Sequence, residues 1–245
     1  MAKSFVAAVT LALMSLAAHA QIKPGEYVMG AGYGTLLVSA DKGGELRFHL
    51  NARGANFHTC ELSGVIRNGE TRMEDSADAK LPCIVTFKAQ KDAIDVGSRH
   101  ERACSSYCGA RAHFEGVYQM PPAGCAPGHV RETRNRFKAA YDKKLFAEAR
   151  ALLAPVAEKC TGSLSDYDAA WIGNDLALTH YRAGDSAACR TTLKPWLELA
   201  QTPDDKIQGD YPPSDAAHWL RIAQATRANL NICGAPVTPG ARAKP

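Results

Sequence analysis

The chain has 245 residues, of which 46% are hydrophobic and 22% charged, and its formal net charge at pH 7 is +4. This composition excludes wholesale disorder and collagen-like or low-complexity architecture. The small positive charge comes without a basic cluster, so we predict no nucleic-acid partner. The length suits one large domain or two small ones.

The first 20 residues have the pattern of a cleaved export signal. An uncharged run follows Lys3, and Ala18-His19-Ala20 places small residues before Gln21. A transmembrane anchor is the alternative, but the run is shorter than the roughly 20 residues that such a helix needs. No cysteine follows the small residues as a lipidation site. We therefore predict a soluble periplasmic or secreted protein, neither lipid-anchored nor inserted in a membrane.

All eight cysteines lie beyond this signal, and an even number in an exported chain predicts disulfides. A zinc site is the alternative, because Cys104 and Cys108 are four residues apart and His58, His100 and His113 lie nearby. Structural zinc sites typically use two such close pairs, so we predict no metal. Counting cannot deduce the connectivity. Sequential pairing best respects the two-part organisation described below, although its third bond would cross the boundary: Cys60–Cys83, Cys104–Cys108, Cys125–Cys160 and Cys189–Cys233.

From residue 26 to 118 the hydrophobic pattern has a period of two, as in the alternation of Leu46, Phe48 and Leu50 with polar neighbours. Pairs such as Gly43-Gly44 and Asn68-Gly69 separate the runs as turns do. The runs indicate a small antiparallel barrel or sandwich over residues 21–120. The barrel is preferred because closure removes exposed strand edges.

A Pro- and Gly-rich stretch at 121–128 predicts a linker, since it can neither extend a helix nor lie in a central strand. From residue 129 to 233 the period changes to 3.6, which predicts helices that include 167–183, 185–200 and 214–232. Residues 234–245 are expected to form a disordered tail. The predicted fold class is therefore multidomain β + α, a small barrel or sandwich followed by a helical repeat domain.

The helical half carries an internal repeat with a period of 40 residues, typical of helical units that bury their faces against one another. The prolines at the shared position should end or kink their helices in the same way. Five residue types recur at this offset: Ala147, Arg150, Leu153, Pro155 and Glu158 return as Ala187, Arg190, Leu193, Pro195 and Glu198.

Residues 174–185 resemble a tetratricopeptide repeat. Leu176-Ala177 matches the large-and-small pair of that family, and Gly184 matches its inter-helix glycine. Cys189 departs from the usual alanine, Lys144 replaces the glycine of the earlier unit, and the spacing is 40 residues instead of about 34. The resemblance implies a helical adaptor that grips a peptide or protein and performs no chemistry.

In that family the first helix of each pair lines a concave groove. We predict that the groove takes an extended anionic peptide or a C-terminal carboxylate, with Asn174 and the basic residues as hydrogen-bond donors. A solvated basic face is the alternative. Carried over by position, the groove residues are Arg131, Arg134, Lys138, Tyr141, Trp171, Asn174, Leu178, Tyr181 and Arg182.

No pattern typical of catalysis appears in the sequence. The chain has no serine-nucleophile elbow, no phosphate-binding glycine loop and no His-Glu-x-x-His pair. Glu26, Glu61 and Glu115 lie among polar neighbours, so solvated strand faces explain them better than a pair of catalytic acids does. Eight paired cysteines leave no thiol nucleophile. We therefore predict a non-enzyme without a cofactor.

Polar side chains gather beside the barrel cysteines, and a Cys104–Cys108 bond would stiffen the second of these segments for protein binding. A merely decorated barrel rim is the alternative. The barrel also resembles periplasmic lysozyme inhibitors in size and architecture. Ser63-Gly64-Val65-Ile66 is similar to their Ser-Gly-x-x-Tyr inhibitory loop but lacks the aromatic residue, and the likeness implies that Ser63 enters the cleft of an enzyme. The predicted partner-binding residues of the barrel are Asn56, His58, Ser63, Tyr107, Arg111 and His113.

These observations favour an exported binding or adaptor protein whose partner is a protein or peptide, such as an envelope protein. An inhibitor or immunity protein against a cell-wall hydrolase is the second hypothesis. An envelope hydrolase or redox enzyme is the third.

Overall fold

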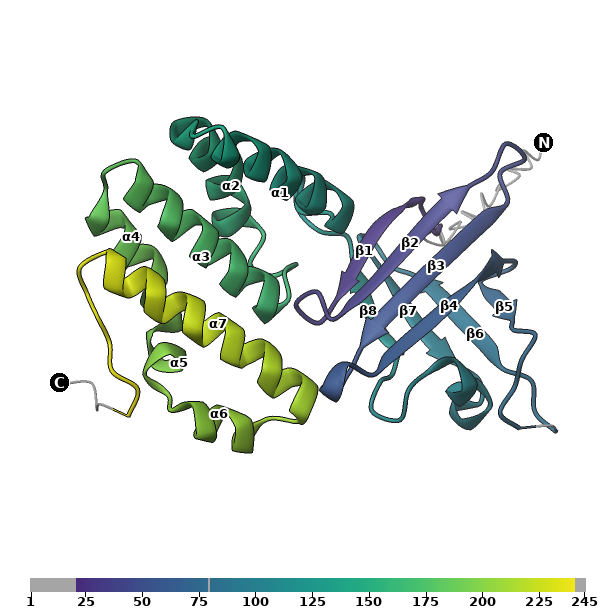
Figure 1. Cartoon of the computed structure of the whole chain (residues 1–245). Helices are drawn as coiled ribbons and strands as arrows, with labels where there is room; N and C mark the ends of the chain where they lie inside the picture. Colours follow the sequence, from purple (N-terminus) through teal and green to yellow (C-terminus); the bar gives the residue numbers. More distant parts are fainter. Residues whose placement is uncertain (1–20, 79, 241–245) are drawn as a thin grey trace, which may run out of the picture.

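The structure, a computed structural model, describes residues 21–78 and 80–240. The predicted signal at 1–20 and the last part of the predicted tail, 241–245, lie outside the described residues. Within the described ranges no helix is both long and apolar enough to cross a membrane. The predicted architecture is confirmed: an antiparallel, nearly closed β-barrel is followed by a helical domain (Figure 1).

The barrel is one antiparallel sheet whose strands follow the order β4-β3-β2-β1-β8-β7-β6-β5. Two short 3-10 helices accompany the strands, η1 (Ala55–Phe57) and η2 (Glu101–Tyr107). The strands are β1 (Gly25–Met29), β2 (Gly34–Ala40), β3 (Leu46–Arg53), β4 (Thr59–Ile66), β5 (Glu70–Arg72), β6 (Ile84–Ala89), β7 (Ala93–Ser98) and β8 (Gly116–Gln119).

The period of two in the sequence places alternate side chains inside the barrel. In β3, Phe48 and Leu50 are buried while Arg47 and His49 are exposed. Large side chains fill the interior, so the centre of the barrel is a packed core. Its largest fully buried members are Tyr118, Phe114, Leu36, Leu50, Leu62 and Ile94.

The helical domain begins with two helical pairs that keep the 40-residue offset. The first helices of the pairs end at Asp142 and Arg182, and the second helices begin at Phe146 and Ser186. The elements are α1 (Pro127–Asp142), α2 (Phe146–Lys159), α3 (Asp166–Arg182), α4 (Ser186–Leu193), η3 (Lys194–Trp196), α5 (Leu197–Gln201), α6 (Asp204–Asp210) and α7 (Pro213–Ile232).

The two prolines of the repeat act differently, so the expectation of a shared bend is wrong. Pro155 lies inside α2, which continues to Lys159. Pro195 lies in η3, where α4 has already ended. Next to Pro195, Trp196 packs close against Gly173 of α3, at a distance that leaves little room for a side chain on that glycine.

Four disulfides are present, and their pairing corrects half of the sequential prediction. Cys125–Cys160 and Cys189–Cys233 are confirmed. The other two are wrong, because Cys60 pairs with Cys108 and Cys83 with Cys104. A 3-10 helix has three residues per turn, so positions four apart point in different directions. Cys104 in η2 therefore reaches Cys83, just before β6, and Cys108 reaches Cys60 in β4, instead of each other.

The described part of the predicted tail packs against the helical domain. Ala235 and Val237 contact the buried cluster around Cys189 and Leu193. The amide of Gly240 donates a hydrogen bond to the carbonyl of Gln201 in α5. Residues 234–240 therefore continue the packed structure beyond α7.

The barrel meets the helical domain at the N-terminal ends of three helices (Figure 1). Glu26 of β1 accepts a hydrogen bond of 2.7 Å from the amide of Gly128 in the first turn of α1. Asn56 of η1 accepts one of 2.9 Å from the amide of Ser214 in the first turn of α7. These barrel side chains satisfy amides that a helix leaves unpaired at its start, and Glu26 brings a negative charge to a positive helix end.

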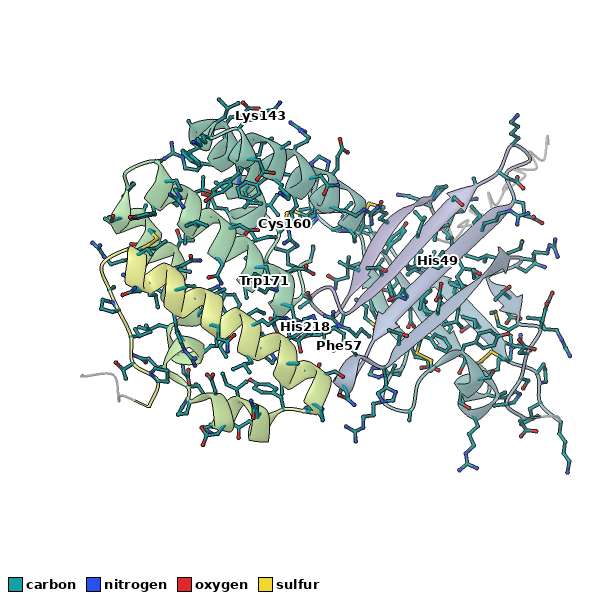
Figure 2. The ribbon with its side chains drawn as sticks, in the orientation of Figure 1. His49, Phe57, Lys143, Cys160, Trp171 and His218 are labelled. Carbon is teal, nitrogen blue, oxygen red and sulfur yellow. A yellow bond between two sulfur atoms is a disulfide. The ribbon has the colours of Figure 1, made fainter. Side chains whose placement is uncertain are left out.

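An aromatic cluster completes this joint. The guanidinium of Arg53 lies 4.8 Å from the ring centre of Phe57 and 4.9 Å from that of Tyr167. Figure 2 shows Phe57 and His218 facing each other, and their ring centres are 4.2 Å apart. The hydroxyl of Tyr167 donates to buried Asp215, which also accepts the amide of Asn56. Cation–π contacts and hydrogen bonds together fix the barrel against α3 and α7.

Candidate functional site

A cleft with a volume of about 720 Å³ lies between α1 and α3. Its barrel end is closed by the β1–β2 turn, where Gly32 lies against the backbone of Ser163 and Ser165. A Cβ on Gly32 would lie 2.6 Å from the amide nitrogen of Ser165, and the φ of +73° also favours glycine. Gly32 is therefore the residue that lets the barrel wall approach the helices so closely.

The wall formed by α1 is the basic stripe that the sequence predicts. Arg131, Arg134, Lys138 and Tyr141 all line the cleft, because residues three and four apart share one helix face. The opposite face of α1 is anchored by buried side chains such as Ala140. The four predicted side chains are thus brought together on one wall.

The opposite wall comes from α3, which Ser165 caps by accepting a hydrogen bond from the amide of Asp168. Asp168, Asp175 and Leu178 project from this helix into the cleft. The carboxylates engage Arg134, whose nitrogens lie 3.3 Å from Asp168 and 3.8 Å from Asp175. Burial raises the pKa of Asp175, and the nearby Arg134 opposes that rise.

The charges that line the cleft balance, with three cations and three carboxylates including Asp142. Lys138 pairs with Asp142 at 2.7 Å, but both side chains are more than half exposed, so the pair contributes little stability. Arg131 has no ion pair within the described residues. It is therefore the cation most available to a ligand, and Lys138 lies about two helical turns further along α1.

The rest of the lining is mostly apolar. Val130 and Phe137 come from α1, Leu164 from the α2–α3 connection and Leu178 from α3. A concave site with an apolar lining and a few polar groups is the usual form of a binding pocket. The arrangement suits a ligand that combines an apolar side chain with an anionic group.

Four predicted groove residues lie elsewhere. Asn174 is only 3% exposed and donates hydrogen bonds to the carbonyl of Ala170 and the hydroxyl of Thr226. Its amide therefore ties α3 to α7 and is not a donor to the cleft. Among the other three, Trp171 packs with the aromatic cluster of the joint, Tyr181 packs against the cluster around Ala177, and Arg182 is exposed at the end of α3.

The predicted barrel residues are dispersed. Asn56 is committed to α7, and the His58 ring packs against Gly109. Arg111 and His113 are exposed in a loop whose backbone packs on Gly54, remote in sequence. Ser63 and Tyr107 share the lining of a second cavity, beside β4.

Ser63-Gly64-Val65-Ile66, taken above as similar to an inhibitory loop, is not a loop. It forms the second half of β4 and pairs in register with β3, Ser63 opposite His49. The surrounding residues alternate between exposed and buried as a strand requires, so this segment cannot protrude into an enzyme cleft as a loop does.

Sequence reasoning missed the acidic wall and the barrel turn. Asp168 and Asp175 are seven residues apart, a spacing that predicts one helix face and could have been noticed. Nothing in the sequence near Gly32 indicates that it contacts residues 163–165. Within the described residues, no group of three or more metal-ligating side chains exists and no cysteine is free.

No protein-family model, no curated protein and no solved structure matches this chain. Four disulfides fit an exported protein, because such bonds persist in oxidising compartments.

Proposed function

We propose that this protein is an exported, non-enzymatic binding protein that holds a short peptide segment in the cleft between α1 and α3. The supporting observation is the cleft itself, about 720 Å³ with an apolar lining and Arg131 and Lys138 on one wall. Like a tetratricopeptide repeat, the helical pairs would present the first helix of each pair to the ligand. The compartment is the periplasm or the extracellular space, reached through the signal at residues 1–20.

The charge arrangement selects the chemistry of the peptide. Arg134 is already engaged by two carboxylates, so the ligand meets Arg131 and Lys138. Arginine binds carboxylates through charge-assisted, bidentate hydrogen bonds. The segment should therefore carry an acidic side chain or a C-terminal carboxylate, next to an apolar side chain that enters between Phe137 and Leu178.

The joint supports the same function. The barrel turn at Gly32 forms the end wall of the cleft, and the bonds from Glu26 and Asn56 hold the barrel in place. A site that is rigid before binding loses little entropy when the ligand docks. The barrel thus acts as a fixed wall for the peptide site.

Selection from a peptide library displayed on phage, with residues 21–245 as bait, tests the proposal. Sequences that combine an acidic group with an apolar residue should be enriched. Synthetic peptides from the selection should bind at least about tenfold more weakly to Arg131→Glu, since a charge-assisted contact becomes a repulsive one. Arg136→Glu is the matched control, because Arg136 is exposed on the same helix but does not line the cleft.

Two outcomes count against the proposal. One is a selection that enriches no such sequence. The other is an equal loss of affinity in Arg131→Glu and Arg136→Glu, which would place the contact outside the cleft. Inhibition of a lysozyme by the isolated wild-type protein would favour the second hypothesis, for which the structure offers no protruding loop at Ser63.

A further inference from the structure

The barrel is open along one seam, between its two edge strands β4 and β5. The hairpin that connects them is closed by hydrogen bonds between Arg67 and Glu70, and the Thr71 hydroxyl donates to the Val65 carbonyl at 2.7 Å. No ladder joins β4 to residues 72–75 in the described chain. The seam is thus tied at its hairpin end and unpaired beyond it.

The other end of the seam is tied as well. The Cys60–Cys108 disulfide links β4 to the segment after η2, and the amide of Gly109 donates to the carbonyl of Thr59 at 2.8 Å. Between Thr59 and Val65, roughly 20 Å of strand at about 3.3 Å per residue, lies a cavity of about 750 Å³. It is a slot with two fixed ends.

The backbone of β4 offers free hydrogen-bonding groups to this slot. Successive residues of a strand direct their amide and carbonyl to opposite sides. Thr59 and Val65 direct their carbonyls to the seam. Glu61 and Ser63 lie an even number of residues from both, so their carbonyls point to the seam as well. Within the described residues the isolated bridge between Cys60 and Cys108 ends beside Glu61, whereas the carbonyl of Glu61 and the backbone of Ser63 have no backbone hydrogen bond on that side. Such an edge is a template for an added strand.

Charges around the slot indicate what kind of strand fits. Arg67 and Glu70 are paired with groups outside the slot, Glu45 and Arg99. Four charged side chains of the slot have no ion pair within the described residues: Arg72 and the acids Glu61, Glu74 and Asp75. The net charge of these four side chains is negative. A second copy of the chain would place its own carboxylates next to them, and like charges repel.

The floor of the slot is apolar. Met73 and Tyr107, which pack on the barrel core, line it, and the Tyr107 hydroxyl accepts a hydrogen bond of 2.9 Å from the amide of Asp75. A strand added to β4 would direct alternate side chains toward this floor and the others toward Glu61. The added strand should therefore alternate between apolar residues, which face the floor, and basic residues, which face Glu61.

We infer that the seam binds an extended segment of another protein in which basic and apolar residues alternate. The segment adds a strand to β4 by bonding the carbonyl of Glu61 and the backbone of Ser63. Its basic side chains face the carboxylates and its apolar side chains face Met73 and Tyr107. This surface is separate from the cleft and does not depend on the function proposed for it.

A direct probe is a capped, fluorescein-labelled five-residue peptide of alternating lysine and valine, with binding to the full chain measured by anisotropy. A second peptide of the same sequence carries N-methyl groups on the amides that would donate to β4. It keeps the charge and loses the donors, so its affinity should fall by about tenfold or more. A glutamate–valine peptide should not bind.

Two protein variants locate the site. Ser63→Pro removes an amide that faces the seam and is not used in the β3 ladder, so an edge strand can accommodate it, and binding should be lost. Glu61→Gln should weaken binding about fivefold, whereas Glu132→Gln, an exposed acid on α1, should leave it unchanged.

Several results would overturn the inference. They are no binding of the lysine–valine peptide, equal affinity of the N-methylated peptide, or equal weakening by Glu61→Gln and Glu132→Gln. Concentration-dependent dimerisation that Ser63→Pro abolishes would assign the edge to a second copy. The N-methylated peptide decides the question even if Ser63→Pro does not fold, because it leaves the protein unchanged.

Discussion

The helical pairs α1–α2 and α3–α4 share one frame, but in the described structure a cleft lies between α1 and α3, whereas α7 packs against the second pair. Arg134 and Asn174 occupy equivalent positions, 40 residues apart, and the side chain of each contacts a helix outside its own pair. Arg134 contacts α3 through Asp168 and Asp175, whereas Asn174 contacts α7 through Thr226. The long arginine spans an open space, and the short amide lets two helices pack directly. The two equivalent side chains thus lie in different kinds of contact, one lining a cleft and the other buried in a packed interface.

The disulfides follow the same division. Cys125–Cys160 closes the first pair on itself, from two residues before α1 to the residue that follows α2. Cys189–Cys233 joins the second pair to the end of α7 instead. The second pair is therefore locked covalently to its neighbour, whereas the first pair is held against α3 by packing, because Ile172 and Leu176 of α3 belong to its buried cluster.

The largest effect is expected from removing the lock of the second pair. Replacing Cys189 and Cys233 by alanine opens a loop of 44 residues and should lower the free energy of unfolding by about 4 kcal/mol. Urea denaturation of the double variant and the parent measures the difference. A change below about 1 kcal/mol would mean that α7 is held in place without the bond.

A smaller effect should separate Asn174 from Arg134. Asn174→Ala removes buried hydrogen bonds to Thr226 and Asn229 and should cost about 2 kcal/mol of unfolding free energy. Arg134→Ala breaks only partly exposed ion pairs and should cost less than about 1 kcal/mol. Thermal and urea unfolding compare the two variants. Equal losses would remove the distinction between an open and a closed contact.

The turns of the two pairs predict changes of opposite sign. Gly184 has φ +86° and Lys144, at the equivalent position, has φ +62°. Gly184→Ala should cost about 1 kcal/mol, and Lys144→Gly should gain up to about 1 kcal/mol, because the left-handed conformation strains residues with a side chain. The unfolding midpoints should therefore move apart. A stabilising Gly184→Ala would contradict the equivalence of the turns.

The smallest effect concerns His180, whose equivalent in the first pair is Ala140. Burial, then the positive charge of Arg150, lowers the pKa of His180 below 6.5, and Asp185 partly opposes this. The unfolded chain then takes up the proton first, so stability should fall as the pH drops from 6.5 toward the lowered pKa of the folded state. His180→Gln should flatten this part of the curve. Parallel curves for both proteins would rule out the contribution of His180.

Periodicity predicts the order of the two domains and the basic stripe of α1, because both depend on residues close together in the sequence. The stripe from Arg131 to Tyr141 lines the cleft as a helix requires. Asn174 is misassigned, since its burial depends on α7, about 50 residues further along. Groove residues that are carried over by position from a repeat family do not show whether another helix of this chain covers them.

The joint and the barrel disulfides are beyond prediction for a related reason. Asn56 meets Ser214 across 158 positions, and Glu26 meets Gly128 across 102. Cys60 reaches Cys108 only because the nearly closed barrel brings the start of β4 beside the segment that follows η2. Such contacts depend on the curvature of the sheet, which cannot be predicted from the spacing of the residues in the sequence.

The central claim, that the cleft between α1 and α3 holds a peptide, is tested most directly by site-specific photo-crosslinking. A photoreactive residue is placed at Asn135, which lines the cleft, or at Arg136, its exposed neighbour on α1, which does not line the cleft. A peptide selected on the protein should crosslink at position 135 and not at position 136. Equal crosslinking at both positions, or crosslinking at 136 alone, would contradict the account.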